Sequence, residues 1–403
     1  MNYEYAFLSC LVPEQMREVV YQNSKHNMQD AANALEWHIY DGLCQNLNCE
    51  VKIINILPIA SYPQYYKKAF IKKEIFSTEN SQENVNLGFC NVKFIRKYSQ
   101  YLSAYKRVKQ WLGSSPNPKT VFVYTASVPF LKALNRLKKE FDVKVCVIIA
   151  DLPHLTSLSS KKSLIKSWSN AYLAKKSYRL LSQVDYYVLL TKHMADYLKI
   201  DKPYCVMEGI ATGAEEFNTP IYDSKIKTVF YAGTLHKRFG VLHLLKAFGL
   251  ISDPDYRLVI CGAGDSEQEI IDAAKVDDRI IFHGQLPRSE VLKLIASATV
   301  LVNPRQNNEE FTKYSFPSKN LEYLSSGVPL IAYKLDGIPN EYDEFIYYVE
   351  DNSIESMVGK IIEVCELSIE RRIICGKAAQ HFVINNKNEV VQTRKIIEMI
   401  WNR

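Results

Sequence analysis

Short apolar runs alternate with longer segments of helical length along most of the chain. Five runs of strand length stand in the first half of the sequence: YAFLSCLV, VKIINILPI, TVFVYTAS, VKVCVIIADLP and VDYYVLLT. Six more follow in the second half: KTVFYAGTL, YRLVICGAG, RIIFHGQL, TVLVNPR, VPLIAYK and FIYYVED. Strands that alternate with helices favour a parallel, doubly wound sheet. The sequence therefore predicts an α/β protein with two Rossmann-like sheets.

The alternation loosens between residues 207 and 225, where MEGIATGAEEFNTPIYDSK has no clear period. A chain of 403 residues also suits two domains of ordinary size. We therefore expect one Rossmann-like domain over 1–207 and a second over 208–384. Residues 385–403 are expected to form a C-terminal helix. One possibility is that this helix crosses back to the N-terminal domain. Two parallel sheets of this kind would face an interdomain cleft, with ligands at the carboxyl ends of the strands.

Composition excludes several classes of protein. A formal net charge of +6 is too small for a dedicated nucleic-acid binder. The nine cysteines are scattered and form no C-x-x-C pair, which is typical of reduced thiols and predicts neither disulfides nor a zinc site. The N-terminus has no basic region before a short apolar run, and no stretch approaches the length of a membrane span. We therefore expect a cytoplasmic protein.

The turn after the first apolar run of the second half concentrates cationic side chains. Gly233 ends this run, and Lys237 and Arg238 stand in the loop before Gly240 and a helical segment. Cations in a strand-to-helix turn can face an anion, and phosphate is the natural candidate. The alternative is an ordinary turn with solvated side chains.

A second candidate anion site is the segment SFPSKNLE. Pro317 suits the first turn of a helix, and Ser315 or Ser318 could cap it. The free backbone N–H groups and Lys319 would then oppose the charge of a diphosphate. Glu322, one turn inside, would repel phosphate but could accept hydrogen bonds from ribose hydroxyls. The alternative is a capped structural helix with Glu322 on the surface.

Two glycine turns follow other apolar runs. Gly262 and Gly264 lie between a strand and a helix, but no third glycine completes a dinucleotide-binding fingerprint. We interpret this turn as one that passes close to a nucleotide. Backbone groups from Gly284 to Leu286 could meet the edge of a nucleobase, although a plain turn is an equal alternative.

In their order along the chain, these motifs resemble a known family. G-T-L-x-K-R-x-G, C-G-x-G-(D/E), H-G-x-L and N-P-R…F-P-S-K-x-x-E-Y-x-x-S-G-x-P are similar to the second domain of family four (group 1) retaining glycosyltransferases, which have the GT-B fold. QDAANALEWHIYDGL, SYPQYYKK, ADLP and LLTKHM…KPYCVMEG resemble a branch that makes bacterial surface and capsular polysaccharides. The resemblance implies transfer of a sugar, with retention, from a nucleotide-sugar donor such as a UDP-sugar. The acceptor would be a glycan, lipid-linked in this branch. The alternatives to a transferase are a nucleotide-sugar epimerase and a catalytically silent partner subunit.

The resemblance assigns roles to individual residues. Arg238, with Lys237 beside it, would contact the donor diphosphate. The chain departs from the family at Thr234, where an arginine usually follows the strand-ending glycine, so the resemblance leaves open which of the two cations serves. Glu322 matches the second glutamate of the family's E-x7-E pattern, which holds the ribose. Eight positions earlier the chain has Tyr314 in place of the first glutamate.

The loop before Tyr314 could supply the missing carboxylate. Glu309 or Glu310 could fold back against the donor sugar, or Phe311 and Thr312 could recognise the sugar without a carboxylate. A covalent glycosyl-enzyme requires a positioned carboxylate. The tyrosine therefore favours same-face displacement, in which the leaving diphosphate takes the acceptor's proton. On that mechanism the protein supplies electrostatic stabilisation and no metal.

Candidate acceptor groups follow a strand of the first half. Asp151 and His154 stand where VCVIIADLPHL leaves the sheet, and either could orient or deprotonate an acceptor hydroxyl. The alternative is a helix-capping aspartate with a surface histidine.

A basic stripe with one aromatic residue is expected on a helix soon afterwards. At helical spacing, Lys161, Trp168, Lys175 and Arg179 fall on one face. Such a stripe suits an anionic membrane surface and predicts peripheral attachment to the inner face of the cell membrane. The alternative is a solvated helix with Trp168 packed on its own domain.

Overall fold

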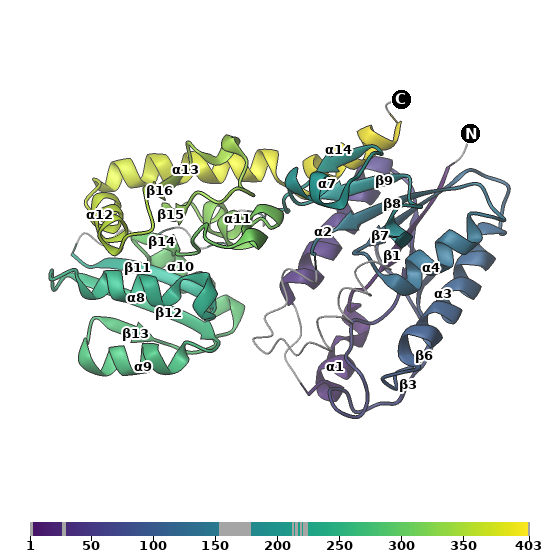
Figure 1. Cartoon of the computed structure of the whole chain (residues 1–403), viewed down its shortest axis with the longest axis horizontal. Coiled ribbons are helices and arrows are strands. Elements are labelled where there is room, and N and C mark those ends of the chain that lie inside the picture. The colour runs from purple at the N-terminus through teal and green to yellow at the C-terminus, as the bar shows by residue number, and fades with distance from the viewer. Residues whose placement is uncertain are drawn as a thin grey trace. The chain divides into compact units, whose positions relative to one another are not determined.

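The chain folds into two compact α/β units. The computed structural model describes residues 3–25, 30–152, 179–211, 213, 217, 220 and 225–401. The first unit is Met1–Glu208 together with Glu389–Arg403, and the second is Gly209–Asn388 (Figure 1). Each unit has its own mainly parallel sheet. This confirms the α/β class that the alternating pattern predicts.

The first unit is built on an eight-stranded sheet with the order β10-β9-β8-β7-β1-β2-β5-β4. Neighbouring strands pair in parallel, except that β4 and β5 are antiparallel. The strands are β1 (Glu4–Ser9), β2 (Val51–Asn55), β4 (Glu74–Phe76), β5 (Asn84–Asn86), β7 (Lys119–Tyr124), β8 (Val143–Ile149), β9 (Tyr186–Leu189) and β10 (Tyr204–Val206). The chain order reverses between β1 and β7, and open α/β sheets bind ligands at the carboxyl ends of strands at such a point.

Helices accompany this sheet. Those described are α1 (Glu14–Asn23), α2 (Asp30–Leu47), α3 (Arg96–Leu112), α4 (Val128–Leu137), α7 (His193–Leu198) and α14 (Glu389–Trp401). The last helix, yellow in Figure 1, packs on α2. Gly42 makes the close approach possible, because an added Cβ would lie 2.4 Å from the Glu389 carbonyl oxygen. Asn46 Nδ2 then donates to the Val390 carbonyl at 2.8 Å.

The sequence pattern missed several short elements of the first unit. Strands β4, β5 and β10 have three residues each, and a separate antiparallel pair is formed by β3 (Phe70–Ile71) and β6 (Phe89–Cys90). Segments this short contain too few residues to display a period.

The second unit has a six-stranded, fully parallel sheet with the order β13-β12-β11-β14-β15-β16. Its strands are β11 (Lys227–Thr234), β12 (Tyr256–Ala263), β13 (Ile280–Phe282), β14 (Val300–Asn303), β15 (Leu330–Tyr333) and β16 (Ile346–Val349). These correspond to the six apolar runs of the second half. In chain order the arrangement is that of a Rossmann fold, with its reversal between β11 and β14.

The connections of the second unit carry its helices. They are η2 (Lys237–Phe239), α8 (Val241–Gly249), α9 (Glu267–Val276), α10 (Arg288–Ser297), η3 (Glu310–Tyr314), α11 (Ser318–Ser325), η4 (Asn340–Tyr342), α12 (Ile354–Cys365) and α13 (Ile369–Asn386). The central strands are buried on both faces, as expected where helices cover both sides of a parallel sheet.

Candidate functional site

The sheet of the second unit splits at its reversal point. Strands β11 and β14 pair only at Val229↔Val300 and Phe230↔Leu301. Beyond these pairs, the Tyr323 hydroxyl accepts a hydrogen bond from Ala232 N at 2.9 Å and donates to Ala232 O at 3.2 Å. The side chain thus satisfies backbone groups that β14 leaves unpaired, and it fixes α11 against the open end of β11.

Lys319 lies against the glycine that ends this split. A Cβ added at Gly233 would be 2.1 Å from Lys319 Cε and 2.3 Å from Nζ, so the end of the lysine side chain lies directly over this glycine. Burial lowers the pKa of Lys319, and the nearby Glu322 carboxylate opposes that shift. A half-buried ammonium at the carboxyl end of a central strand is well placed to bind an anion.

The start of α11 differs in detail from the expected cap. Pro317 is the N-cap residue itself, and no side chain caps the helix. Ser315 instead donates to the Phe311 carbonyl at 3.1 Å, and Ser318 is exposed. The prediction of a serine cap is therefore wrong, because the preceding η3 turn lies close enough to take the Ser315 hydroxyl.

Glu322 lies on the same helix and is paired with an arginine. Arg288 Nη1 donates to its carboxylate at 2.7 Å, and a quarter of the Glu322 side chain is exposed. Arg288 opens α10, so the contact ties the starts of two helices on the ligand side of the sheet.

The two cations expected on a diphosphate have different surroundings. Lys237 is exposed and forms an ion pair with Glu269 of α9. Arg238 is only 19% exposed and binds both carboxylate oxygens of Glu309, through Nε at 3.3 Å and through Nη2. Of the two, Arg238 is the one held inward, toward the loop that follows β14.

The β11–α8 turn is fixed by a glycine. Gly240 has φ +81°, and an added Cβ would lie 1.9 Å from the Pro304 carbonyl oxygen. This contact brings the turn after β11 against the turn after β14.

The arginine of the N-P-R motif, to which the family resemblance assigned no role, lies in the second of these turns. Arg305 stands two residues after β14, with its guanidinium carbon 4.3 Å from the ring centroid of Phe311 and 5.1 Å from that of Phe239. Arg238 contacts the same Phe311 ring at 4.2 Å. Burial and then Arg238 lower the pKa of Arg305 to about 10. Its position at a strand end was the signal available in the sequence.

The segment around η3 forms its own hollow. Thr312 is buried, and its hydroxyl lies 2.6 Å from the Glu309 carbonyl and 2.7 Å from Asn307 Oδ1, so the side chain holds the loop. Glu310 is exposed, and the Tyr314 hydroxyl lies 3.4 Å from its carboxylate. The hollow measures about 250 Å³, and its lining residues are Asn307, Asn308, Glu309, Glu310, Thr312, Lys313 and Asp336.

The remaining residues expected at the nucleotide line neighbouring strand ends. Thr234 is exposed at the end of β11. Gly262 has φ +137°, and an added Cβ would lie 1.8 Å from the Gly233 carbonyl oxygen. Gly284 O accepts from Gly262 N at 2.8 Å, while Leu286 packs on the core. These turns therefore form one continuous edge with the β11 turn.

The first unit places a buried carboxyl group at its own reversal point. Glu36 of α2 is 1% exposed and accepts a hydrogen bond from Cys10 N at 2.5 Å, just beyond β1. Burial raises the pKa of Glu36 well above its usual range. The pKa of Tyr124, at the end of β7, is raised by burial and then by Glu36. Glu36 lies in the segment QDAANALEWHIYDGL, but no role was assigned to this glutamate from the sequence.

The expected acceptor groups are only partly described. Asp151 is exposed just beyond β8. His154 lies outside the described residues, and so do Lys161, Trp168 and Lys175, whereas Arg179 is exposed. Among the described residues, no helix is long and apolar enough to cross a membrane.

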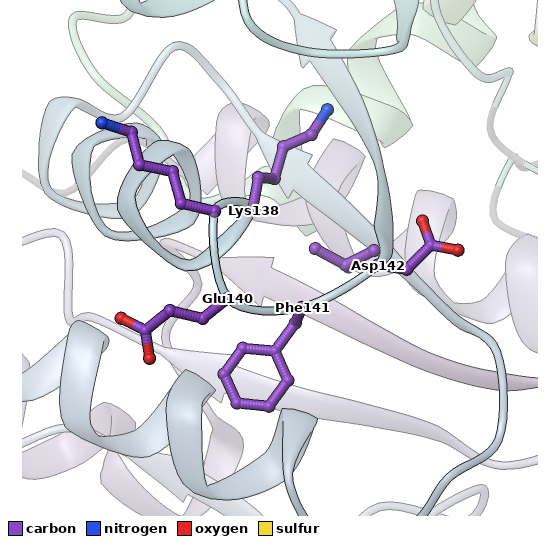
Figure 2. A pocket seen from close by; sticks show the side chains of 6 residues that line it. Lys138, Glu140, Phe141 and Asp142 are labelled. Atoms are coloured by element: carbon purple, nitrogen blue, oxygen red, sulfur yellow. The ribbon is translucent and has the colours of Figure 1, made fainter.

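A larger hollow of about 370 Å³ lies elsewhere on the first unit. It follows the turn between α4 and β8, from Lys138 to Val143. Figure 2 shows the charged ends of Lys138, Glu140 and Asp142 pointing in different directions around this turn. The turn enters β8 at its amino end, the edge opposite to the one at which parallel sheets bind ligands. The hollow is therefore a surface feature and not the candidate site.

Comparisons with known proteins agree with this arrangement. Residues 214–382 match the family model described as Glycosyl transferases group 1. An uncharacterized glycosyltransferase of Haemophilus influenzae is 28% identical over 141 residues, which are 33% of this chain and only 37% of that protein.

Solved structures match nearly the whole chain. Sucrose-phosphate synthase from Thermosynechococcus elongatus has a TM-score of 0.68 at 12% identity, with 99% of each chain covered. The lipopolysaccharide outer core galactosyltransferase WaaB has a TM-score of 0.59 at 15% identity, also with 99% of each chain covered. A TarM mutant of S. aureus, solved with fondaparinux, alpha-GlcNAc-glycerol and UDP, has a TM-score of 0.59 at 10% identity and 100% coverage of both chains. The chain therefore has the GT-B fold, and its residues 214–382 match the family model of the group 1 glycosyl transferases.

Proposed function

We propose that this protein transfers a sugar from a nucleotide diphosphate donor, with retention, onto a glycan acceptor. The observation that carries the proposal is the set of cations at the β11–β14 reversal point. Lys319, Arg238 and Arg305 come from three segments to the carboxyl edge of one sheet. Such a set suits the diphosphate of a nucleotide sugar, and it lies inside the region that matches the group 1 family model.

The donor we propose is a UDP-sugar. TarM, which shares the fold, has been solved with UDP. In this chain, Glu322 stands one turn inside α11 and would accept from the ribose hydroxyls, after exchanging part of its contact with Arg288. The turn from Gly284 to Leu286 would border the base. The diphosphate would lie over the split between β11 and β14.

The mechanism we propose is same-face displacement. Tyr314 occupies the position at which the family has a glutamate, and its hydroxyl contacts Glu310, which is exposed. Charge that grows on the leaving phosphate would be stabilised by Lys319 and the arginines, with no metal required for that step. The same phosphate would take the proton from the acceptor hydroxyl.

The acceptor we propose is a lipid-linked glycan of a surface or capsular polysaccharide, bound at the inner face of the membrane. Asp151, exposed at the carboxyl end of β8, is a candidate for orienting the acceptor hydroxyl. A catalytically silent GT-B subunit is the second candidate function, and the tyrosine at position 314 is the observation that favours it.

A panel of nucleotide sugars tests the proposal. The protein would be incubated with each donor and a lipid-linked glycan, and the anomeric configuration of the product would be read by NMR. Transfer with retention from a UDP-sugar is the expected result. Binding without transfer or donor hydrolysis would favour the silent subunit, and conversion of the donor without acceptor would indicate an epimerase.

The role of Glu322 has a sharper test. If its carboxylate holds the ribose, Glu322→Gln should reduce the preference for UDP over 2′-deoxy-UDP, measured by calorimetry. The matched control is Glu290→Gln, whose carboxylate lies on the neighbouring helix α10 and pairs with Lys293. An unchanged preference in Glu322→Gln would exclude Glu322 from the ribose site.

A further inference from the structure

One carboxylate lies among the cations of the candidate site. Glu309 accepts two hydrogen bonds from Arg238, so the arginine expected on the donor diphosphate is already neutralised. A guanidinium engaged by both oxygens of a carboxylate presents the same fork that it would use on a phosphate. The Glu309 carboxylate therefore engages the same N–H groups of Arg238 that a diphosphate would need.

The second arginine of the site has no such partner. Arg305 Nε is buried and has no hydrogen-bond partner within the described chain. Its guanidinium is held by the ring of Phe311, which also contacts Arg238. Two cations on one buried aromatic ring, with one carboxylate between them, leave a surplus positive charge at the carboxyl edge of β11 and β14.

Glu309 can leave Arg238 without movement of its own backbone. The Glu309 carbonyl is held by Thr312, through the backbone N–H at 3.1 Å and the hydroxyl at 2.6 Å. Its side chain is 37% exposed, and the hollow of about 250 Å³ that it borders is also lined by Asn307, Asn308 and Lys313. A change of side-chain rotamer would therefore move the carboxylate toward amide and ammonium donors.

We propose that Glu309 is a built-in competitor of the donor, which neutralises Arg238 in the free protein and is exchanged for the diphosphate when donor binds, while Arg305 supplies a second cation to the same anion. The exchange rests on the proposed function. Without donor, two arginines and one glutamate face each other. With donor, each phosphate group would meet one guanidinium, so the arginine that lacks a carboxylate in the free protein would also gain an anion.

Calorimetry with inorganic pyrophosphate tests the exchange on the full-length chain. Glu309→Gln removes the competing charge and is expected to tighten pyrophosphate binding about five- to thirtyfold. The control is Glu363→Gln, because Glu363 is an exposed carboxylate on α12 that pairs with Lys360 instead of Arg238. It should bind pyrophosphate like the wild type. Circular dichroism melting would verify that each variant is folded.

Two further variants separate the parts of the proposal. In an Arg238→Gln background, Glu309→Gln should not increase pyrophosphate affinity, because Glu309 then has no arginine to neutralise. Arg305→Gln should weaken pyrophosphate binding with and without Glu309. Equal or weaker binding by Glu309→Gln, or a gain that persists without Arg238, would overturn the exchange, and unchanged binding by Arg305→Gln would remove Arg305 from the site.

Failure of the exchange can be told apart from failure of the proposed function. If the wild type transfers sugar but Glu309→Gln brings no gain, only the competitor is excluded. If neither form binds pyrophosphate or a nucleoside diphosphate and no sugar is transferred, both proposals fall.

Discussion

The hydroxyl of Tyr323 forms two hydrogen bonds with the backbone of Ala232, at 2.9 and 3.2 Å, in the place where β11 loses its neighbour β14. A side chain of α11 thus satisfies the backbone of β11 at the point where its pairing with β14 ends. The same helix carries Lys319 and Glu322. The position of these two side chains relative to β11 therefore depends on Tyr323.

Tyr323→Phe should destabilise the second unit by about 1–3 kcal/mol, because a buried N–H and a buried carbonyl lose their partner. Thermal unfolding followed by circular dichroism would measure the loss. Tyr98→Phe, at an exposed position of α3, is the control and should be near neutral. Equal melting of both variants would mean that the backbone of Ala232 finds another partner.

Gly240→Ala should cost at least about 1 kcal/mol from the left-handed backbone alone. The added Cβ would also overlap the Pro304 carbonyl oxygen and displace the neighbouring Arg305. Pyrophosphate affinity should therefore fall together with stability. Gly359→Ala is the matched control in the same unit: it lies exposed in the middle of α12 with no atom near the new Cβ, and should gain about 0.5–1 kcal/mol. Urea unfolding should therefore show a lower free energy of unfolding for Gly240→Ala and a higher one for Gly359→Ala.

Lys319→Met should change stability and binding in opposite directions. Burial lowers the pKa of Lys319, so the charged side chain destabilises the folded protein at pH values below the ordinary lysine pKa. Methionine carries no charge and removes this cost. We therefore expect the free energy of unfolding to rise by up to about 1 kcal/mol. Loss of the ammonium should weaken pyrophosphate binding by about 1.5–3 kcal/mol, tenfold or more. Lys293→Met, on the exposed face of α10, should change neither. A stable variant with unaltered pyrophosphate affinity would place the anion elsewhere.

Glu36→Gln should alter the pH dependence of stability in the first unit. The folded-state pKa of Glu36 is raised above its ordinary value of 4.5, so the folded protein keeps a proton that the unfolded chain releases. Stability of the wild type therefore falls as pH rises from about 4.5 toward the folded-state pKa. Glutamine keeps the acceptor for Cys10 N without this loss, so the variant should gain on the wild type as pH increases. If the stability of the wild type and of Glu36→Gln changed with pH in the same way, Glu36 would not be protonated in the folded protein. Glu14→Gln, at an exposed position, serves as the control.

Five strands of the first sheet and the six strands of the second could be predicted because each lies in a continuous apolar run, and a run buried on both faces favours a parallel sheet between helices. The turn from Gly233 to Gly240 and the segment FPSKNLE could be predicted to lie at one edge of the second sheet, since the carboxyl ends of parallel strands meet there. The absence of a serine cap on α11 could not be predicted, because the hydroxyl of Ser315 is taken by η3, a turn with no clear period.

The sequence by itself thus determined the two Rossmann-like sheets, the helix that carries Lys319 and Glu322, and the side of the sheet on which they lie. Only the tertiary structure decided how the charges are paired. Lys237 pairs with Glu269, and Arg238 pairs with Glu309. Arg305 lies beside Phe311 and forms no ion pair with any carboxylate among the described residues. Long charged side chains take their partners from whichever loops the fold brings near. Arg238 and Glu309 are 71 positions apart in the chain, and no local pattern records that contact.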